Sequence, residues 1–303
     1  MTETTQTGGT LPVAQHSAAH AVVRLPPGLY FVATPIGAAR DITLRGLDIL
    51  ASADLLAAED TRTLRHLLDI HGVALSGRPL IAYHDHNGAA VRPRILRALA
   101  EGKSVAYASE AGTPLVADPG FQLGRAALAA GAPVFAAPGP SAVLAALTVS
   151  GLPSDRFLFA GFPPATKAAR KSWLTAIKDV QATLIFYESP KRVCQLLIDL
   201  AQCLGGERQA VVARELTKRF EEVRRGTVSE LAAGFSGQSV KGEIVVLVDR
   251  AAVAPAGLDE VEAALRDRLA RMRVKEAATE VAEALGVPRR DVYQMALRLE
   301  AEE

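Results

Sequence analysis

The chain has 303 residues, of which 49% are hydrophobic and 5% aromatic, and its formal net charge at pH 7 is +1. This length favours two domains with a small appendage. The chain is rich in Ala, Val and Leu and poor in aromatic residues, which suits an α/β protein of buried strands and packed helices. The near-zero charge excludes a protein drawn to nucleic acid by its overall field, so a polyanionic partner would need a local basic patch.

The cysteines and the hydropathy of the chain indicate the cellular compartment of the protein. Cys194 and Cys203 are the only cysteines and fall in one predicted helix without zinc-ligand spacing, which favours a reducing compartment. No apolar run approaches the length of a membrane span. Residues 1–24 lack the basic start and long apolar centre of a signal peptide. We therefore expect a disordered leader over residues 1–27 and a cytoplasmic protein.

Between residues 28 and 150, apolar runs alternate with stretches of helical periodicity. Continuous apolar strands separated by helices indicate a largely parallel sheet with both faces covered, so this segment is predicted to be an N-terminal parallel α/β domain. The strand-like runs, with the loops that follow them, cover residues 29–37, 53–60, 79–86, 104–112 and 132–141.

After Gly151 the predicted strands follow one another more directly, with one clear helix over 189–205. This pattern predicts a C-terminal mixed-sheet α/β domain over 151–250. A small-residue linker leads to residues 258–303, which are helical in pattern with a turn at "LGVPRR" and resemble a helix-turn-helix.

Small and polar residues collect at the carboxyl end of every predicted strand of the first domain: "TPIG", "EDTR", "HDH", "SEAGTP" and "PGPS". Carboxyl ends of parallel strands form the ligand-binding edge of such sheets, so the five loops predict a pocket, although Gly and Pro also simply punctuate loops. Neither GxGxxG nor GxxxxGKS is present. A ligand without phosphate is therefore favoured, and an adenosine-bearing sulfonium is one candidate.

The same segments, in this order, resemble the ribosomal RNA small subunit methyltransferase I family of the tetrapyrrole-methylase superfamily. The resemblance runs from about Gly28 to the C-terminus. It departs from the common family pattern at Ala38, where Asn is usual, and at Glu110, where Asp is usual. The segments that carry it are "LYFVATPIG", "AAEDTR", "YHDHN", "SEAGTPLVADPG", "PGPSAVLAALTVSGLPSDRFLFAGF", "LIFYES", "ARELTK" and "KGEIVVLV".

The resemblance implies two α/β domains of tetrapyrrole-methylase type with an S-adenosylmethionine cleft between them, a small C-terminal helical domain, and a homodimer. It also implies 2′-O-methylation of a cytidine ribose in the decoding region of small-subunit (16S) ribosomal RNA, either as free RNA or in the assembled subunit. The cofactor contacts that it implies are Pro35, Gly37, Glu110, Ala111, Gly112, Pro114, Ser141, Ala142, Tyr187 and Ala213. Tyr187 would equally suit a core position on a buried strand.

The remaining candidate residues are charged. Removing the ribose proton favours a nearby base, and the acidic residues Glu59 and Asp60 are the candidates to accept the proton or orient the ribose. Arg62 is a candidate phosphate contact. Asp60 would equally serve as the cap of a helix beginning at Thr61 and as the ion-pair partner of Arg62. The candidate RNA contacts are Arg170, Lys171, Lys218, Arg219, Arg289 and Arg290.

Several alternatives stay open at this point. Lys218 would also suit an ion pair with Glu215, and the net acidic tail would also suit packing or dimerisation. His84 and His86 could chelate a metal, but no third ligand is evident nearby and we expect no metal. The rival functions are a C-methyltransferase of tetrapyrrole or corrinoid precursors and a non-catalytic nucleic-acid-binding protein.

Overall fold

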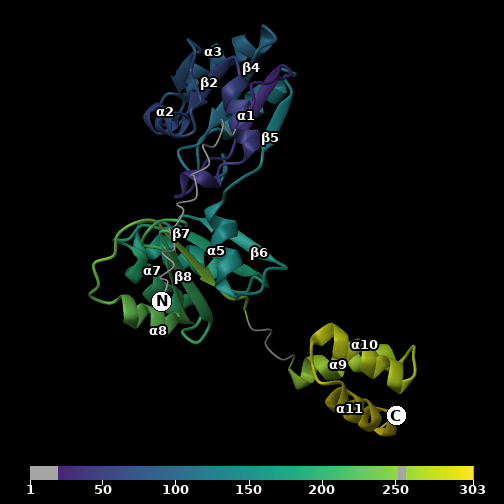
Figure 1. Cartoon of the computed structure of the whole chain (residues 1–303). Helices are drawn as coiled ribbons and strands as arrows, with labels where there is room; N and C mark the ends of the chain where they lie inside the picture. Colours follow the sequence, from purple (N-terminus) through teal and green to yellow (C-terminus); the bar gives the residue numbers. More distant parts are fainter. Residues whose placement is uncertain (1–19, 252–256, 303) are drawn as a thin grey trace, which may run out of the picture. The chain divides into compact units, whose positions relative to one another are not determined.

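The computed structural model describes residues 20–251 and 257–302. Contacts within the described chain divide it into two compact units (Figure 1). The first unit holds two β-sheets and comprises the residues up to 175 together with 183–249. The second unit comprises 176–182 and the tail from residue 250.

The first sheet is parallel, with the strand order β3-β2-β4-β1-β5. Its strands alternate with helices along the chain, as predicted. The elements are β1 (Gly28–Val32), a 3-10 turn (Ala39–Asp41), α1 (Leu44–Ser52), β2 (Leu55–Ala58), α2 (Thr61–Ile70), β3 (Leu80–Ala82), α3 (Gly88–Ala100), β4 (Ser104–Ala108), α4 (Phe121–Ala129) and β5 (Val134–Ala137).

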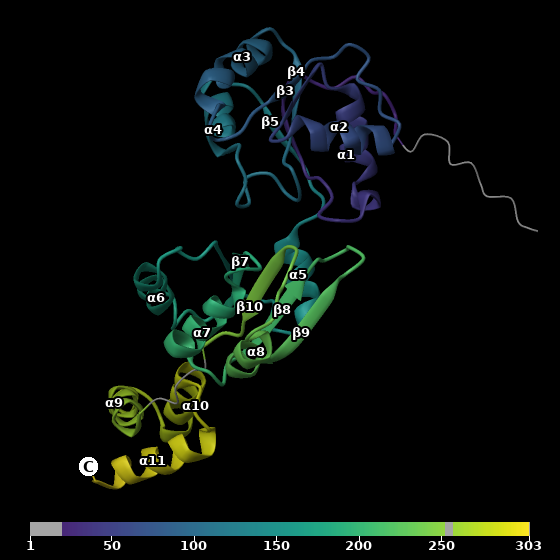
Figure 2. The ribbon, with the colours of Figure 1, turned by 90° about the vertical axis from the view of Figure 1, so that its left-hand side faces the viewer.

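Two apolar layers enclose this sheet. Along β1, Tyr30 and Val32 join the layer under α1 and α2, whereas Leu29 and Phe31 join the layer under α3 and α4. Successive side chains of a strand point to opposite faces, so both layers draw on the same strands. Figure 2 shows the two helix pairs on opposite sides of the sheet. The strands therefore end at a common edge, where their loops meet.

The second sheet is mixed, with the order β6-β7-β10-β8-β9; only β6 and β7 pair in parallel. Besides the predicted helix there are two that the sequence did not reveal, α6 and α8. The elements are α5 (Ala142–Ser150), β6 (Phe157–Gly161), α6 (Lys167–Ala176), β7 (Thr183–Glu188), α7 (Val193–Leu204), β8 (Gln209–Arg214), β9 (Glu222–Thr227), α8 (Val228–Phe235) and β10 (Ile244–Val248).

The boundary predicted at residue 150 is wrong for α5. Val143, Ala146 and Leu147 pack with the second sheet, in a core that includes Ile185 and Leu247. The reason is that α5 is apolar around most of its circumference, so its sequence does not indicate which sheet it covers.

The expected leader proves to be partly ordered. Residues 1–19 lie outside the described residues. Within 20–27, however, the backbone N–H of Ala21 donates to Asp48 and that of Val23 to Ser52, at 2.6 and 2.8 Å, so this part lies along α1. The boundary at residue 27 was therefore wrong, because these bonds depend on side chains that follow later in the chain.

The tail contains three helices, α9 (Leu258–Leu269), α10 (Val274–Leu285) and α11 (Arg289–Glu302). They enclose an apolar core of their own that includes Leu265, Val281 and Ala296. Gly286 ends α10 in the left-handed conformation, with a φ of 63°, at the predicted turn. Within the described ranges, none of the helices combines the length and apolar character that crossing a membrane requires.

Candidate active site

A cavity of about 640 Å³ lies within the first unit, between loops of both sheets. Its volume falls in the range of about 300–1,000 Å³ typical of small-molecule sites. All of the predicted cofactor residues line it except Pro114, which is buried, and of the predicted catalytic residues only Glu59 does. Other lining residues include Asp118, Phe162, Glu188, Lys218 and Glu243.

The loop after β4 is fixed by its own polar contacts. Thr34 and Gly112 exchange two backbone hydrogen bonds, each 2.9 Å long, and the Ser109 hydroxyl donates to the Gly112 carbonyl at 2.9 Å. Gly112 has a φ of 83°, which a side chain would strain. The backbone of Ala111 and Gly112 is thereby held at the cavity wall.

The same loop stores strain nearer to its end. Leu115 and Ala117 are not glycines, yet their φ angles are 74° and 62°. Such residues persist only where the surroundings enforce them, and here the Tyr107 hydroxyl donates to the Pro119 carbonyl at 3.0 Å. Strain of this kind concentrates at functional sites, and it positions Asp118 at the cavity.

A second contact joins the loops of the two sheets. The backbone N–H of Ala38 donates to the Thr217 hydroxyl at 3.1 Å, so this position uses its backbone and needs no Asn side chain. A Cβ on Gly37 would lie 2.5 Å from Thr217 Oγ1 and 2.9 Å from the Leu216 carbonyl oxygen. Only glycine permits this close approach.

Three of the carboxyl groups that line the cavity, those of Glu59, Glu110 and Asp118, influence one another. Burial, with the neighbouring charges of Glu59 and Glu110, raises the pKa of Asp118 to about 7. Burial also raises the pKa of Glu59, whose carboxylate accepts a 3.3 Å hydrogen bond from the Glu110 backbone. Sequence reasoning missed Asp118. The available signal was a second acid in "SEAGTPLVADPG", directly before Pro-Gly.

Asp60 and Arg62 do not line the cavity. Asp60 caps α2 by accepting the Arg62 backbone N–H at 2.7 Å, and its other oxygen binds the Arg62 guanidinium at 2.7 Å. These bonds lower the Asp60 pKa to about 2, which makes it a weak base. The Arg62 side chain is 90% exposed. The structure thus supports the alternative of a helix cap with an ion pair.

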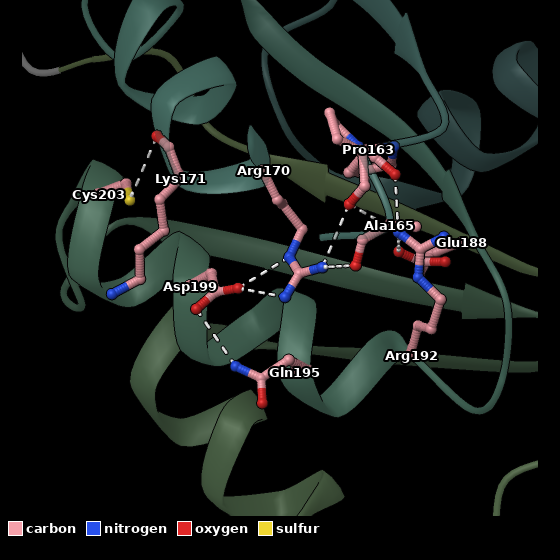
Figure 3. A network of polar contacts seen from close by, with 10 residues as sticks. Pro163, Ala165, Arg170, Lys171, Glu188, Arg192, Gln195, Asp199 and Cys203 are labelled. Atoms are coloured by element: carbon pink, nitrogen blue, oxygen red, sulfur yellow. Dashed lines mark hydrogen bonds and ion pairs between the residues drawn. The ribbon is translucent and has the colours of Figure 1, made fainter. Parts of the chain in front are cut away.

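Arg170 is not an RNA contact, and this prediction was wrong. Its side chain is 5% exposed and pairs with the fully buried Asp199 at 2.6 Å (Figure 3). The guanidinium also donates to the carbonyls of Pro164 and Ala165, at 3.2 and 3.0 Å. The basic run in the sequence did not reveal that α6 turns this residue inward.

The other predicted RNA contacts differ in exposure. Lys218 binds Glu215 at 3.1 Å and Glu243 at 2.8 Å, so the alternative ion pair is present. Lys171 is half-buried, whereas Arg219 is exposed beside Phe220. Arg289 and Arg290 are exposed in the first turn of α11.

The two candidate metal ligands stand close together. The rings of His84 and His86 are 5.9 Å apart between centroids. Across residues 20–251 and 257–302, no group of three or more His, Cys, Asp or Glu side chains is arranged to hold a metal ion.

Comparison with known proteins defines the class first. The family model of the tetrapyrrole (corrin/porphyrin) methylases matches residues 28–232, and that of the RsmI C-terminal HTH domain matches 255–300. The structure of uroporphyrin-III-C-methyltransferase from Thermus thermophilus shares the fold, with a TM-score of 0.53 and 22% identity over 74% of this chain and 95% of that one. Diphthine synthase also shares the fold, with a TM-score of 0.57 and 18% identity over 73% of this chain and 89% of that one.

Closer relatives define the family. Proteins named ribosomal RNA small subunit methyltransferase I are 49% identical in Mesorhizobium japonicum, over 91% of this chain and 93% of theirs, and 45% identical in Xylella fastidiosa, over 88% and 98%. The one from Mycobacterium tuberculosis strain H37Rv is 42% identical over 88% and 93%. The chain belongs to the ribosomal RNA small subunit methyltransferase I family. The predicted fold class, with two sheets and a helical tail, and the predicted methyltransferase are confirmed.

Proposed function

We propose that the protein methylates the ribose 2′-hydroxyl of a cytidine in the decoding region of small-subunit (16S) ribosomal RNA, with S-adenosylmethionine as donor. Family membership supports the substrate class. The observation that carries the chemistry is the cavity, where tightly held backbone meets carboxyl groups of raised pKa.

The residues at the cavity fit this cofactor. The volume of about 640 Å³ suits a nucleoside-sized ligand, and the small residues Ala111, Gly112 and Ala213 leave backbone open to close approach. Carboxylates at Glu59, Glu110 and Asp118 favour a cationic ligand. When bound, S-adenosylmethionine supplies a methyl group activated by a sulfonium.

The protein's own part is alignment and proton transfer. Rigid loops that hold an acceptor ribose in line reduce the barrier by removing its freedom. A base within the cavity must take the hydroxyl proton, and Asp118 suits this role because its pKa of about 7 lies near the working pH. Glu59 lies beside it and supports its raised pKa.

Basic side chains outside the cavity would hold the RNA. Arg219 and Lys171 on the first unit, and Arg289 and Arg290 on the tail, are candidate phosphate contacts. Lys218 stabilises the cavity wall through its ion pairs with Glu215 and Glu243. A homodimer remains part of the proposal, from the family resemblance.

Methyl transfer from labelled S-adenosylmethionine to small ribosomal subunits lacking the modification tests this function. One ribose methyl on one decoding-region cytidine is the expected result. Transfer to a corrin or porphyrin precursor instead would establish the small-molecule alternative. Binding of RNA without any transfer would establish the non-catalytic one.

A further inference from the structure

Phe162 is a large aromatic side chain that remains exposed on the cavity wall. It follows β6 directly, lines the cavity and is 59% exposed. A single exposed apolar residue is ordinary on a protein surface. One that faces a cavity between rigid loops offers an apolar surface to whatever enters.

Neighbouring rings fix the position of Phe162. Its ring lies 5.5 Å from that of Tyr187 at an interplanar angle of 65°, and Tyr187 lies 4.8 Å from Phe159 at 63°. Such edge-to-face contacts are favourable and hold each ring in one orientation. Tyr187 is half-buried and Phe162 is exposed, so the row of rings runs from the core of the second sheet to the cavity rim.

Two arginines, Arg170 and Arg192, hold the backbone that follows Phe162, at Ala165 and Pro163 (Figure 3). Arg170 donates to the carbonyls of Pro164 and Ala165, and Arg192 donates to those of Pro163 and Pro164, at 2.6 and 3.1 Å. The two prolines further limit this segment, because their φ angles are fixed.

Both arginines are themselves held by acids. Asp199 accepts from Arg170 Nε at 2.8 Å, and its second oxygen accepts from Gln195 at 3.2 Å. Arg192 pairs with the buried Glu188 at 3.1 Å. Burying the charges of Arg170, Asp199 and Glu188 costs desolvation energy that apolar side chains would not require. These ion pairs therefore fix the position of the loop at a cost in desolvation energy.

We propose that Phe162 is the platform on which the base of the acceptor nucleotide stacks, an inference that rests on the proposed function. Proteins recognise unpaired nucleotides by stacking their bases on aromatic rings, and the interaction tolerates any base. A ribose held in the cavity leaves its base near the rim, where Phe162 is exposed. The close-approach residues Gly112 and Ala213 line the same cavity and are buried.

A photochemical cross-link tests the platform without requiring methyl transfer. A short ribo-oligonucleotide of the decoding region, with 5-iodocytidine in place of cytidine, is irradiated with the full-length protein. The cross-link is expected at Phe162. In parallel, Phe162→Ala is expected to weaken oligonucleotide binding about 5- to 150-fold and to leave the affinity for S-adenosylmethionine unchanged.

Two controls separate stacking from loss of fold. Phe162→Tyr keeps a ring and should bind like the wild type. Phe121→Ala removes an equally exposed aromatic side chain outside the cavity, 58% exposed, and should have no effect. A cross-link at other residues only, together with unchanged RNA binding by Phe162→Ala, would overturn the platform.

The remaining outcomes are distinguishable. Loss of cofactor affinity with unchanged RNA binding would assign the ring to the cofactor and overturn the proposal. If the wild type cross-links at Phe162 yet methylates no ribosomal substrate, the proposed function fails while the stacking site stands.

Discussion

Ala38 and Thr217 are 179 residues apart in the chain, and a 3.1 Å hydrogen bond joins the backbone N–H of one to the side-chain hydroxyl of the other. The bond ties the loop after β1 to the turn after β8. That turn is itself constrained, because Glu215 and Thr217 have φ angles of 52° and 63°. The cavity wall thus depends on a contact between loops of two different sheets.

Thr217→Val should weaken this wall, because it leaves the Ala38 N–H without its acceptor. We expect a loss of about 1–2 kcal/mol in the free energy of unfolding and weaker binding of S-adenosylmethionine, measured by urea denaturation and calorimetry. Thr217→Ser keeps the hydroxyl and should restore both. Equal losses in the Ser and Val variants would show that the hydrogen bond is not responsible.

Asp118→Asn should abolish the response of the methyl-transfer rate to pH near neutrality. In the wild type the single-turnover rate should rise with pH and level off above about pH 7, as the carboxyl ionises. The variant should be slower by about 10²–10⁴-fold and lack this limb. A variant that keeps both the wild-type rate and its rise with pH would exclude Asp118 as the base.

The same substitution should stabilise the fold at alkaline pH. The pKa of Asp118 is about 7 in the folded state and about 3.9 in an unfolded chain, so between these values the folded state binds more protons. Stability is therefore lost as pH rises from about 4 to 7. Relative to the wild type, Asp118→Asn should raise the melting temperature at pH 8 and not at pH 4.

Asp60→Asn should retain methyl-transfer activity, because Asp60 does not line the cavity and an Asn side chain can still cap α2. Asp60→Ala should lower the melting temperature by removing the cap. Measuring rate and melting temperature together decides between the roles. A large fall in rate for Asp60→Asn, at unchanged stability, would restore Asp60 as a catalytic candidate.

Arg170→Leu should destabilise the protein by about 3–5 kcal/mol, because it leaves the buried Asp199 without its counter-charge. Arg170→Leu combined with Asp199→Leu should recover much of that loss in urea denaturation. If the single and double variants are equally unstable, packing of the Arg170 side chain matters more than its charge.

Arg290→Gln should reduce by about one the slope of log K for RNA binding against log salt concentration, if the exposed tail contacts phosphate. Arg94→Gln is the matched control, since Arg94 is an exposed arginine on α3 of the first sheet. Identical slopes for the two variants would favour packing or dimerisation as the role of the tail.

The sequence by itself determined the layout of the fold. Runs such as "VAYA" and "IVVLV" are apolar without interruption, a pattern that is typical of strands buried on both faces. Alternation with helices implied the parallel sheet, and the loops after its strands implied the cavity. These are local features, since hydrophobic periodicity and turn residues act over a few positions.

Only the tertiary structure decided which charged residues are buried in ion pairs, which are exposed and which have a shifted pKa. Arg170 and Arg219 look alike in the sequence, yet one is buried against Asp199 and the other is exposed. Asp118 has a pKa of about 7 because it is buried and because Glu59 and Glu110 lie near it in space. Burial and Coulomb interactions depend on distances between elements far apart in the chain, and local sequence patterns carry no record of those distances.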